Sequence, residues 1–128
     1  MVVDDSPEVL DALSSLLKEL ERAEIYKFRS AEEALNCFAL YPDEFQLVIT
    51  DLGLPGMSGI ELCRRMREIS PSAKIILSTG SALTSEQAAK EAEFSAILEK
   101  PYTASELWEL VNSLLPEKES EDDDHDHI

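Results

Sequence analysis

The feature that most constrains the fold is a repeated succession of an apolar run, a loop and a helix-start signal. Ser6 precedes Pro7, an N-cap residue followed by proline at the first helical position. Four later segments fit the capping-box pattern Ser/Thr-x-x-Glu/Gln, each a few residues after an apolar run. One match is weak evidence, but the repetition predicts a recurring strand-loop-helix unit. The four segments are Ser30…Glu33, Ser58…Glu61, Thr84…Gln87 and Thr103…Glu106.

The short apolar runs are the expected strands of this unit. Between the first two runs, Leu10, Leu13 and Leu17 recur at helical spacing. Strands that alternate with helices form parallel sheets covered by helices on both faces. We therefore expect an α/β fold of five βα units with a doubly wound parallel sheet. The expected strands are Met1 to Val3, Ile25 to Phe28, Leu47 to Thr50, Ile75 to Ser78 and Ala96 to Leu98.

The length of 128 residues and the 44% apolar composition fit a single domain. The last helix ends at Pro116, which predicts a domain over residues 1–116. Residues 117–128 hold seven acids and one lysine, a composition typical of a disordered tail. The first strand has only three residues before Asp4, which is short for a central strand and favours a start further upstream.

The net charge of −16 limits the partners that this chain can bind. It repels phosphate backbones, which argues against direct nucleic-acid binding and favours protein partners or cations. No apolar run approaches the roughly 18 residues of a membrane span, and the start lacks the basic region of a secretory signal. Cys37 and Cys63 fit no metal spacing. We therefore expect a cytoplasmic protein with reduced cysteines and no membrane contact.

Charged and hydroxyl side chains follow four of the expected strands, at the edge where open parallel sheets bind ligands. Asp4 and Asp5 follow the first strand, Asp51 the third, Thr79 the fourth and Lys100 the fifth. Three ionised carboxylates about 4 Å apart repel by roughly 1 kcal/mol per pair in water, and more when they are partly buried. One lysine does not balance them, so a hard divalent cation such as Mg²⁺ is expected. Asp51 is then placed as a nucleophile that forms an aspartyl phosphate.

Four segments in this order and spacing resemble the receiver domain of two-component response regulators, including the chemotaxis-regulator type. They are "VVDDSPEVL", "VITDLGLPGMSG", "ILSTG" and "ILEKPY", and the resemblance covers residues 1–116. It implies a flavodoxin-like (βα)5 sheet with strand order 2-1-3-4-5. It also implies phosphoryl transfer to Asp51 from the phosphohistidine of a histidine kinase or a histidine phosphotransfer protein.

The resemblance implies roles for the other residues of the site. Asp5 resembles the direct Mg²⁺ ligand, Asp4 assists through water, and the backbone carbonyl of Gly53 completes the protein's ligands. Lys100 resembles the lysine that pairs with the acyl phosphate, and its bond to Pro101 is often cis in such domains. Thr79 resembles the hydroxyl residue that moves to bind the phosphate.

One position departs from the family pattern. Ile97 stands three residues before Lys100, where these domains usually carry a Tyr or Phe switch. A branched aliphatic side chain cannot repeat the swing of an aromatic ring. We therefore expect phosphorylation to change the loop at Ser81 to Leu83 more than the side chain of Ile97.

The resemblance implies a binding module that phosphorylation switches, with Mg-dependent self-phosphorylation and slow self-dephosphorylation as its only catalytic activities. Its output would pass to a separate protein, through the face formed by the fourth helix, the fifth strand and the last helix. Trp108, on that last helix, is either partly buried or part of this face. The tail segment "DDDHDHI" is interpreted as a solubilising extension rather than a metal site.

Three alternatives stay open beside this interpretation. Residues 78–101 are also similar to receivers of hybrid sensor kinases, so the chain could be cut from a longer protein. It could be a receiver-shaped scaffold that phosphorylation does not regulate. A haloacid-dehalogenase-like phosphatase also uses an Asp nucleophile after a parallel strand, but its second Asp would stand at position 53, which is Gly53.

Overall fold

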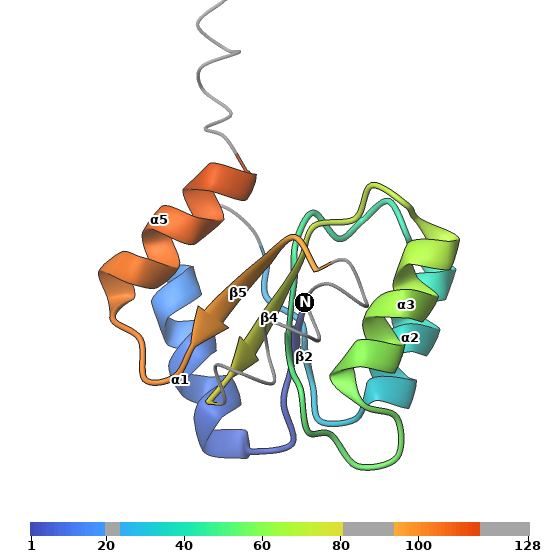
Figure 1. Ribbon diagram of the computed structural model, residues 1–128, viewed down its shortest axis with the longest axis horizontal. Coiled ribbons are helices and arrows are strands. Elements are labelled where there is room, and N and C mark those ends of the chain that lie inside the picture. Colours follow the sequence, from blue (N-terminus) through green and yellow to red (C-terminus); the bar gives the residue numbers. More distant parts are fainter. Residues whose placement is uncertain (20–23, 81–93, 116–128) are drawn as a thin grey trace, which may run out of the picture.

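The five predicted strands form one parallel sheet in the order β2-β1-β3-β4-β5, which confirms the expected topology. The computed structural model describes residues 1–19, 24–80 and 94–115. Helices lie on both sides of the sheet (Figure 1). The elements are β1 Val2–Val3, α1 Pro7–Lys18, β2 Lys27–Phe28, α2 Ala31–Leu40, β3 Val48–Asp51, α3 Gly59–Ile69, β4 Ile75–Thr79, β5 Ala96–Glu99 and α5 Ala104–Leu114.

Two apolar clusters hold the helices to the two faces of the sheet. On one face, α1 and α5 pack through residues such as Leu13 and Val111 against Val2, Ile49 and Ile76. On the other face, α2 and α3 pack against Val3, Val48 and Ile75, and their buried residues include Phe38, Leu62 and Met66. Neighbouring residues of each central strand therefore enter opposite clusters, as expected for strands buried on both faces.

The helix starts follow the predicted capping residues. The side chains of Ser6, Ser30, Ser58 and Thr103 each accept a hydrogen bond from a backbone N–H in the first turn of the helix that they precede. The reciprocal bond of a complete capping box is formed by Glu106, whose carboxylate accepts from the N–H of Thr103 at 2.8 Å. At α3 the carboxylate of Glu61 contacts Arg65 instead. Each cap satisfies a backbone donor at the helix end that faces the carboxyl ends of the strands.

Two strands, β1 and β2, are shorter than the apolar runs that predicted them. β2 begins at Lys27, although the run begins at Ile25, and β3 keeps the predicted length but begins one residue later, at Val48. β1 is Val2–Val3, so it provides no paired residue opposite Ile25. The predicted fourth helix with Thr84…Gln87, the loop at Ser81 to Leu83 and the tail at 117–128 lie outside the described residues.

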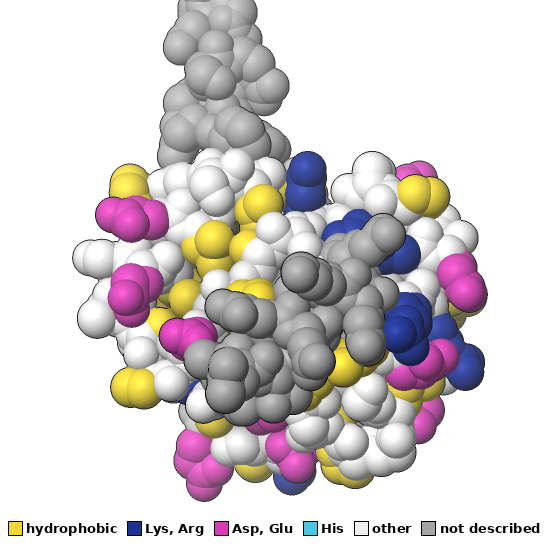
Figure 2. Space-filling view, in the orientation of Figure 1, with side chains coloured by type: hydrophobic (Ala, Val, Ile, Leu, Met, Phe, Trp, Pro, Cys, Tyr) yellow, Lys and Arg dark blue, Asp and Glu magenta, His cyan; other side chains and the backbone are white. Residues whose placement is uncertain are grey.

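Charged side chains are distributed unevenly over the described surface. In Figure 2, Lys and Arg side chains gather over α3, while Asp and Glu side chains are scattered around the margin of the view. The sequence of α3 explains the basic side, because it contains Arg64, Arg65 and Arg67. Cys37 and Cys63 form no disulfide, and none of the described helices is long and apolar enough to cross a membrane.

Candidate functional site

Three carboxylates meet at the carboxyl ends of two neighbouring strands. Asp4 and Asp5 follow β1, and Asp51 is the last residue of β3, which pairs with β1 in parallel. One carboxylate oxygen from each of the three lies within 4.8 Å of the others. Asp4 is buried with 4% exposure, Asp51 is partly buried and Asp5 is exposed. The predicted acidic cluster therefore exists, and its members differ in their access to water.

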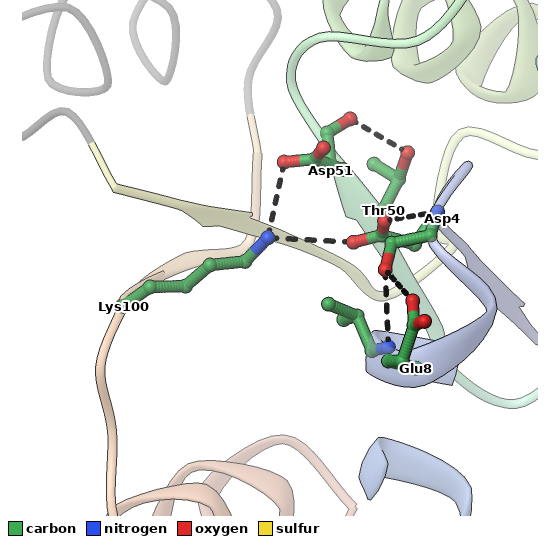
Figure 3. A network of polar contacts seen from close by, with 7 residues as sticks. Asp4, Glu8, Thr50, Asp51 and Lys100 are labelled. Atoms are coloured by element: carbon green, nitrogen blue, oxygen red, sulfur yellow. Dashed lines mark hydrogen bonds and ion pairs between the residues drawn. The ribbon is translucent and has the colours of Figure 1, made fainter. Parts of the chain in front are cut away.

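Lys100 places its positive charge between two of these carboxylates. Its Nζ lies 3.3 Å from Oδ2 of Asp4 and 3.5 Å from Oδ1 of Asp51. Figure 3 shows the lysine reaching across from the end of β5 to both acids. The main chain of Lys100 is fixed as well, because its N–H donates to the carbonyl of Thr79 at 2.9 Å. The Lys100–Pro101 bond is cis, as the resemblance implied.

The proximity of these charges changes the pKa of two of them. Burial raises the pKa of Asp51, and the Asp4 carboxylate adds to this effect, while Lys100 opposes it. Burial alone would lower the pKa of Lys100, but Asp4 and Asp51 outweigh burial and raise it. A raised lysine pKa keeps the ammonium charged near neutral pH. With one lysine for three acids, the cluster still holds an excess of negative charge.

Backbone groups hold Asp4 in place. The N–H of Ser6 donates to Oδ1 of Asp4 at 3.0 Å, while Oδ2 faces Lys100. The hydroxyl of Ser6 donates to Glu8 and accepts from the N–H of Val9, so the start of α1 is tied to the acid. A buried carboxylate is stable only when such partners compensate its lost hydration. Asp4 is therefore a rigid part of the site.

The chain that carries Asp51 is held by residues that the sequence interpretation missed. The hydroxyl of Thr50 donates to the carbonyl of Asp51 at 3.0 Å. The N–H of Gly59 donates to the carbonyl of Leu52 at 2.9 Å, and a Cβ at position 59 would lie 2.1 Å from the Asp51 carbonyl oxygen. Only glycine allows this approach of α3 to the end of β3. The available signal was the glycine directly after the Ser58 cap.

Thr79 and Gly53 lie at the same edge of the sheet as the acids. Thr79 is the last residue of β4 and is buried, and its neighbour Ser78 is in register with Asp51. Gly53 lies two residues beyond Asp51, and a methyl group added there would meet no atom within 4 Å. Packing therefore does not require glycine at position 53. The group that the resemblance implies as a metal ligand is the backbone carbonyl, which any residue would provide.

Ile97 and Trp108 lie away from the carboxylates. Ile97 is in register with Leu77 and is partly buried on β5, the edge strand. Trp108 is 49% exposed and lines a groove between α1 and α5 with Leu16 and Glu19. This position supports partial burial against α1 for Trp108.

The fold and this edge together define a class of protein. A five-stranded parallel sheet in the order 2-1-3-4-5, with helices on both faces, is the flavodoxin-like fold. The response regulator receiver domain family matches residues 1–112, so the chain belongs to this family. Receiver domains are signalling domains.

Similar proteins support this assignment over most of the chain. The response regulator receiver protein CpdR of Brucella abortus (strain 2308) is 36% identical over 100 residues, covering 77% of this chain and 81% of that protein. Sporulation initiation phosphotransferase F of Bacillus subtilis (strain 168) is 30% identical over 120 residues, covering 92% and 94%. A crystal structure of a response regulator receiver domain protein from Clostridium thermocellum superposes with a TM-score of 0.82 at 29% identity, covering 93% and 94%. Other curated relatives are longer, and the chain spans between 25% and 50% of their length.

Proposed function

We propose that this chain is a phosphoacceptor that takes a phosphoryl group from a phosphohistidine onto Asp51. The observation that carries the proposal is the meeting of Asp4, Asp5 and Asp51 at one edge of the sheet, with Lys100 between two of them. The donor is a histidine kinase or a histidine phosphotransfer protein. The Bacillus relative of similar length is named a phosphotransferase, which supports this chemistry.

The proposed step exchanges one bond to phosphorus for another. A carboxylate oxygen of Asp51 attacks phosphorus, and the bond from phosphorus to the donor's imidazole nitrogen breaks. That nitrogen keeps the electron pair, and Asp51 becomes an acyl phosphate. In slow hydrolysis, water attacks phosphorus, the bond from phosphorus to the Asp51 oxygen breaks, and inorganic phosphate leaves a free Asp51 carboxylate. Positioning and charge neutralisation provide most of the catalysis in such transfers.

Lys100 and Asp4 have complementary tasks in this step. The ammonium of Lys100, 3.5 Å from Asp51, is placed to neutralise an oxygen of the incoming phosphoryl group. Asp4 holds the ammonium from the other side at 3.3 Å and is itself fixed by Ser6. The hydroxyl of Thr79, at the end of the neighbouring strand, is proposed to bind the phosphoryl group once it is attached.

The acidic cluster fits a divalent cation with oxygen ligands, and we propose Mg²⁺. The donor set supports this choice. Three carboxylates whose oxygens lie within 4.8 Å of one another, with one lysine, leave an excess of negative charge that a hard cation balances. Asp5 and Asp51 are the accessible ligands, with the carbonyl of Gly53. Asp4 already contacts Lys100 and Ser6, which suits an indirect role through water. When bound, the ion supplies positive charge to the phosphoryl oxygens.

Phosphorylation is proposed to switch binding of a separate output protein. A phosphoryl group can shift the protein to an active arrangement only through contacts that differ between the two states. We propose that Thr79 and Lys100 make these contacts. The face that includes β5 and α5 is the proposed output surface, and Ile97 on β5 replaces the usual aromatic switch. All of these events are proposed to occur in the cytoplasm.

Incubation with acetyl phosphate, with and without Mg²⁺, tests this function by intact-protein mass spectrometry. The wild type should gain one phosphoryl group in the presence of Mg²⁺, and Asp51→Asn should gain none. Asp43→Asn, at an exposed position in the loop before β3, whereas Asp51 ends that strand, is the matched control and should still be modified. A wild type that stays unmodified would favour the alternative of a receiver-shaped scaffold.

A further inference from the structure

The three carboxylates of the site are held in place to different degrees. The side chain of Asp4 contacts the N–H of Ser6 and the ammonium of Lys100, and Asp51 also contacts Lys100. Asp5 is exposed, and among the described residues its carboxylate has no hydrogen bond or ion pair. Asp5 is nevertheless an acid proposed above to bind the metal directly. A group that fixes Asp5 must therefore act on its main chain.

The pairing of β1 with β2 stops just before Asp5. In the part of the chain that the structure describes, the last backbone hydrogen bond between the two parallel strands runs from the N–H of Asp4 to the carbonyl of Phe28, at 3.0 Å. Beyond this bond the two chains lead into α1 and α2, which pack on opposite faces of the sheet. Asp5 therefore lies one residue past the end of the ladder.

The side chain of Arg29 contacts Asp5 at this point. Arg29 directly follows β2, and its Nε and Nη2 both donate to the carbonyl of Asp5, at 3.4 and 3.3 Å. The guanidinium is planar and presents its N–H groups in a fixed geometry, so two bonds to one oxygen restrict the direction of that carbonyl. Arg29 therefore extends the connection between β2 and β1 by one residue, with a side chain in place of the backbone.

This contact gives Arg29 a different role from Lys100. The ammonium of Lys100 lies against two of the acids, whereas the guanidinium of Arg29 contacts the main chain of the third. No carboxylate of the described residues lies within ion-pair distance of Arg29. A guanidinium that served only to balance the negative charge would gain more from a carboxylate, because both partners would then be charged. The arrangement favours orientation of Asp5 over neutralisation.

We propose that Arg29 is a positioning residue, which holds the main chain of Asp5 so that its carboxylate stays near Asp51 and can bind a divalent cation. The inference rests on the proposed function, because it concerns the proposed Mg²⁺ site. Groups that orient a metal ligand from outside typically change metal affinity by about 10- to 100-fold when they are removed. Both Arg29 and Asp5 are exposed, so the effect expected here is at the lower end of this range.

Mg²⁺ binding by Arg29→Ala, followed by titration of the amide NMR signals of the site, tests the proposal. Loss of positioning should raise the Kd for Mg²⁺ about tenfold. Loss of a positive charge near a cation site would by itself lower the Kd, so the sign of the change separates the two roles. Arg29→Lys keeps the charge but lacks the planar pair of donors, and its Kd should also rise. A role in charge alone predicts a wild-type Kd for Arg29→Lys.

Lys27→Ala is the matched control. It removes the same charge two residues earlier in the chain, but Lys27 pairs with Asp11 and not with Asp5. Its Kd for Mg²⁺ should stay within about twofold of the wild-type value at about 0.15 M salt, which screens exposed charges. The Tm of Arg29→Ala without Mg²⁺ should stay within about 2 °C of wild type, because the side chain is exposed.

Phosphorylation by acetyl phosphate separates positioning from direct contact with the phosphoryl group. In Arg29→Ala the Mg²⁺ concentration that gives half the maximal rate should rise about tenfold, and the maximal rate should fall by less than this. A larger fall in the maximal rate would overturn the proposal, because it would assign the guanidinium to the phosphoryl group.

An unchanged or lower Kd for Mg²⁺ in Arg29→Ala would also overturn it. If the wild type binds Mg²⁺ and is phosphorylated, these results remove the role of Arg29 and leave the proposed function intact. A wild type that binds no Mg²⁺ would refute the proposed metal site and the role of Arg29 together.

Discussion

The two ends of the sheet are built from the same strands but carry opposite chemistry. At the carboxyl ends, three acids and Lys100 lie close together and are held by the backbone of Ser6 and Gly59. At the amino ends, the side chains are mainly apolar, and the charged group at the centre is the amine of Met1. The comparison indicates that changes at one end should alter phosphorylation, while changes at the other should alter stability alone.

The largest expected effect is at the carboxyl end. Lys100→Ala removes the charge that faces Asp51, so phosphorylation by acetyl phosphate should slow by about 10²- to 10³-fold, as when other catalytic charge stabilisers are removed. The measurement is the rate of phosphoryl incorporation by intact mass. Lys27→Ala is the control, because Lys27 pairs with Asp11 on the exposed surface. Equal rates for the two variants would contradict the role of Lys100.

A pair of glycines tests whether the main chain positions Asp51. Gly59→Ala places a Cβ 2.1 Å from the Asp51 carbonyl oxygen, so α3 or the end of β3 must move. The cost should reach about 3 kcal/mol in the free energy of unfolding, measured by urea titration, and phosphorylation should slow. Gly53→Ala meets no atom within 4 Å and keeps its carbonyl. Gly53→Ala should therefore lower the free energy of unfolding by less than about 1 kcal/mol. Similar losses for the two variants would contradict a steric need for glycine at position 59.

The amino end should show a pH dependence that the amine of Met1 creates. Its pKa falls from 8.0 in the unfolded chain to about 6 in the folded protein, because burial disfavours the charge. Between these values the unfolded chain binds more protons, so stability is greatest above pH 8 and falls as the pH drops toward 6. The loss should be about 2–3 kcal/mol.

The control for this prediction is the chain acetylated at Met1, which has no amine to titrate. The Cys37 thiol and the carboxylates of Glu24 and Glu44 line the same pocket as Met1, and acetylation leaves all three unchanged. The difference between the two forms in urea titrations at pH 6 and pH 8 therefore isolates Met1. Parallel pH profiles would contradict the burial of this amine.

The smallest expected effect is also at the amino end. Arg67 donates to the carbonyls of Pro71 and Ala73 and to the hydroxyl of Ser95, which joins the end of α3 to the starts of β4 and β5. Arg67→Ala should cost about 1.5–2 kcal/mol by urea titration, with an unchanged phosphorylation rate. Arg65→Ala, on the exposed side of the same helix, should leave Tm unchanged. A slower phosphorylation rate in Arg67→Ala would contradict the expectation that changes at the amino ends of the strands alter stability alone.

Much of the site could be predicted from the sequence, for a physical reason. Asp4, Asp51 and Lys100 each follow an apolar run, and parallel strands place their carboxyl ends at one edge. Local pattern and topology therefore bring them together. The caps at Ser58 and Thr103 are also local, since donor and acceptor are three residues apart.

The features that the sequence did not predict depend on contacts between distant elements. The need for glycine at position 59 arises only when α3 approaches the carbonyl of Asp51. The late start of β2 reflects the partner strand, because β1 has no residue opposite Ile25. The number of residues that pair depends on both strands, whereas apolar periodicity can be read from one strand alone.

Asp51, and not its acidic neighbours, is proposed to carry the phosphoryl group. Sodium borohydride reduces an acyl phosphate to an alcohol and so converts a phosphorylated Asp to homoserine, which peptide mass spectrometry can locate. After treatment with acetyl phosphate and Mg²⁺, homoserine should be found at position 51 alone. Reduction at Asp4 or Asp5, or at no acidic residue, would contradict this proposal.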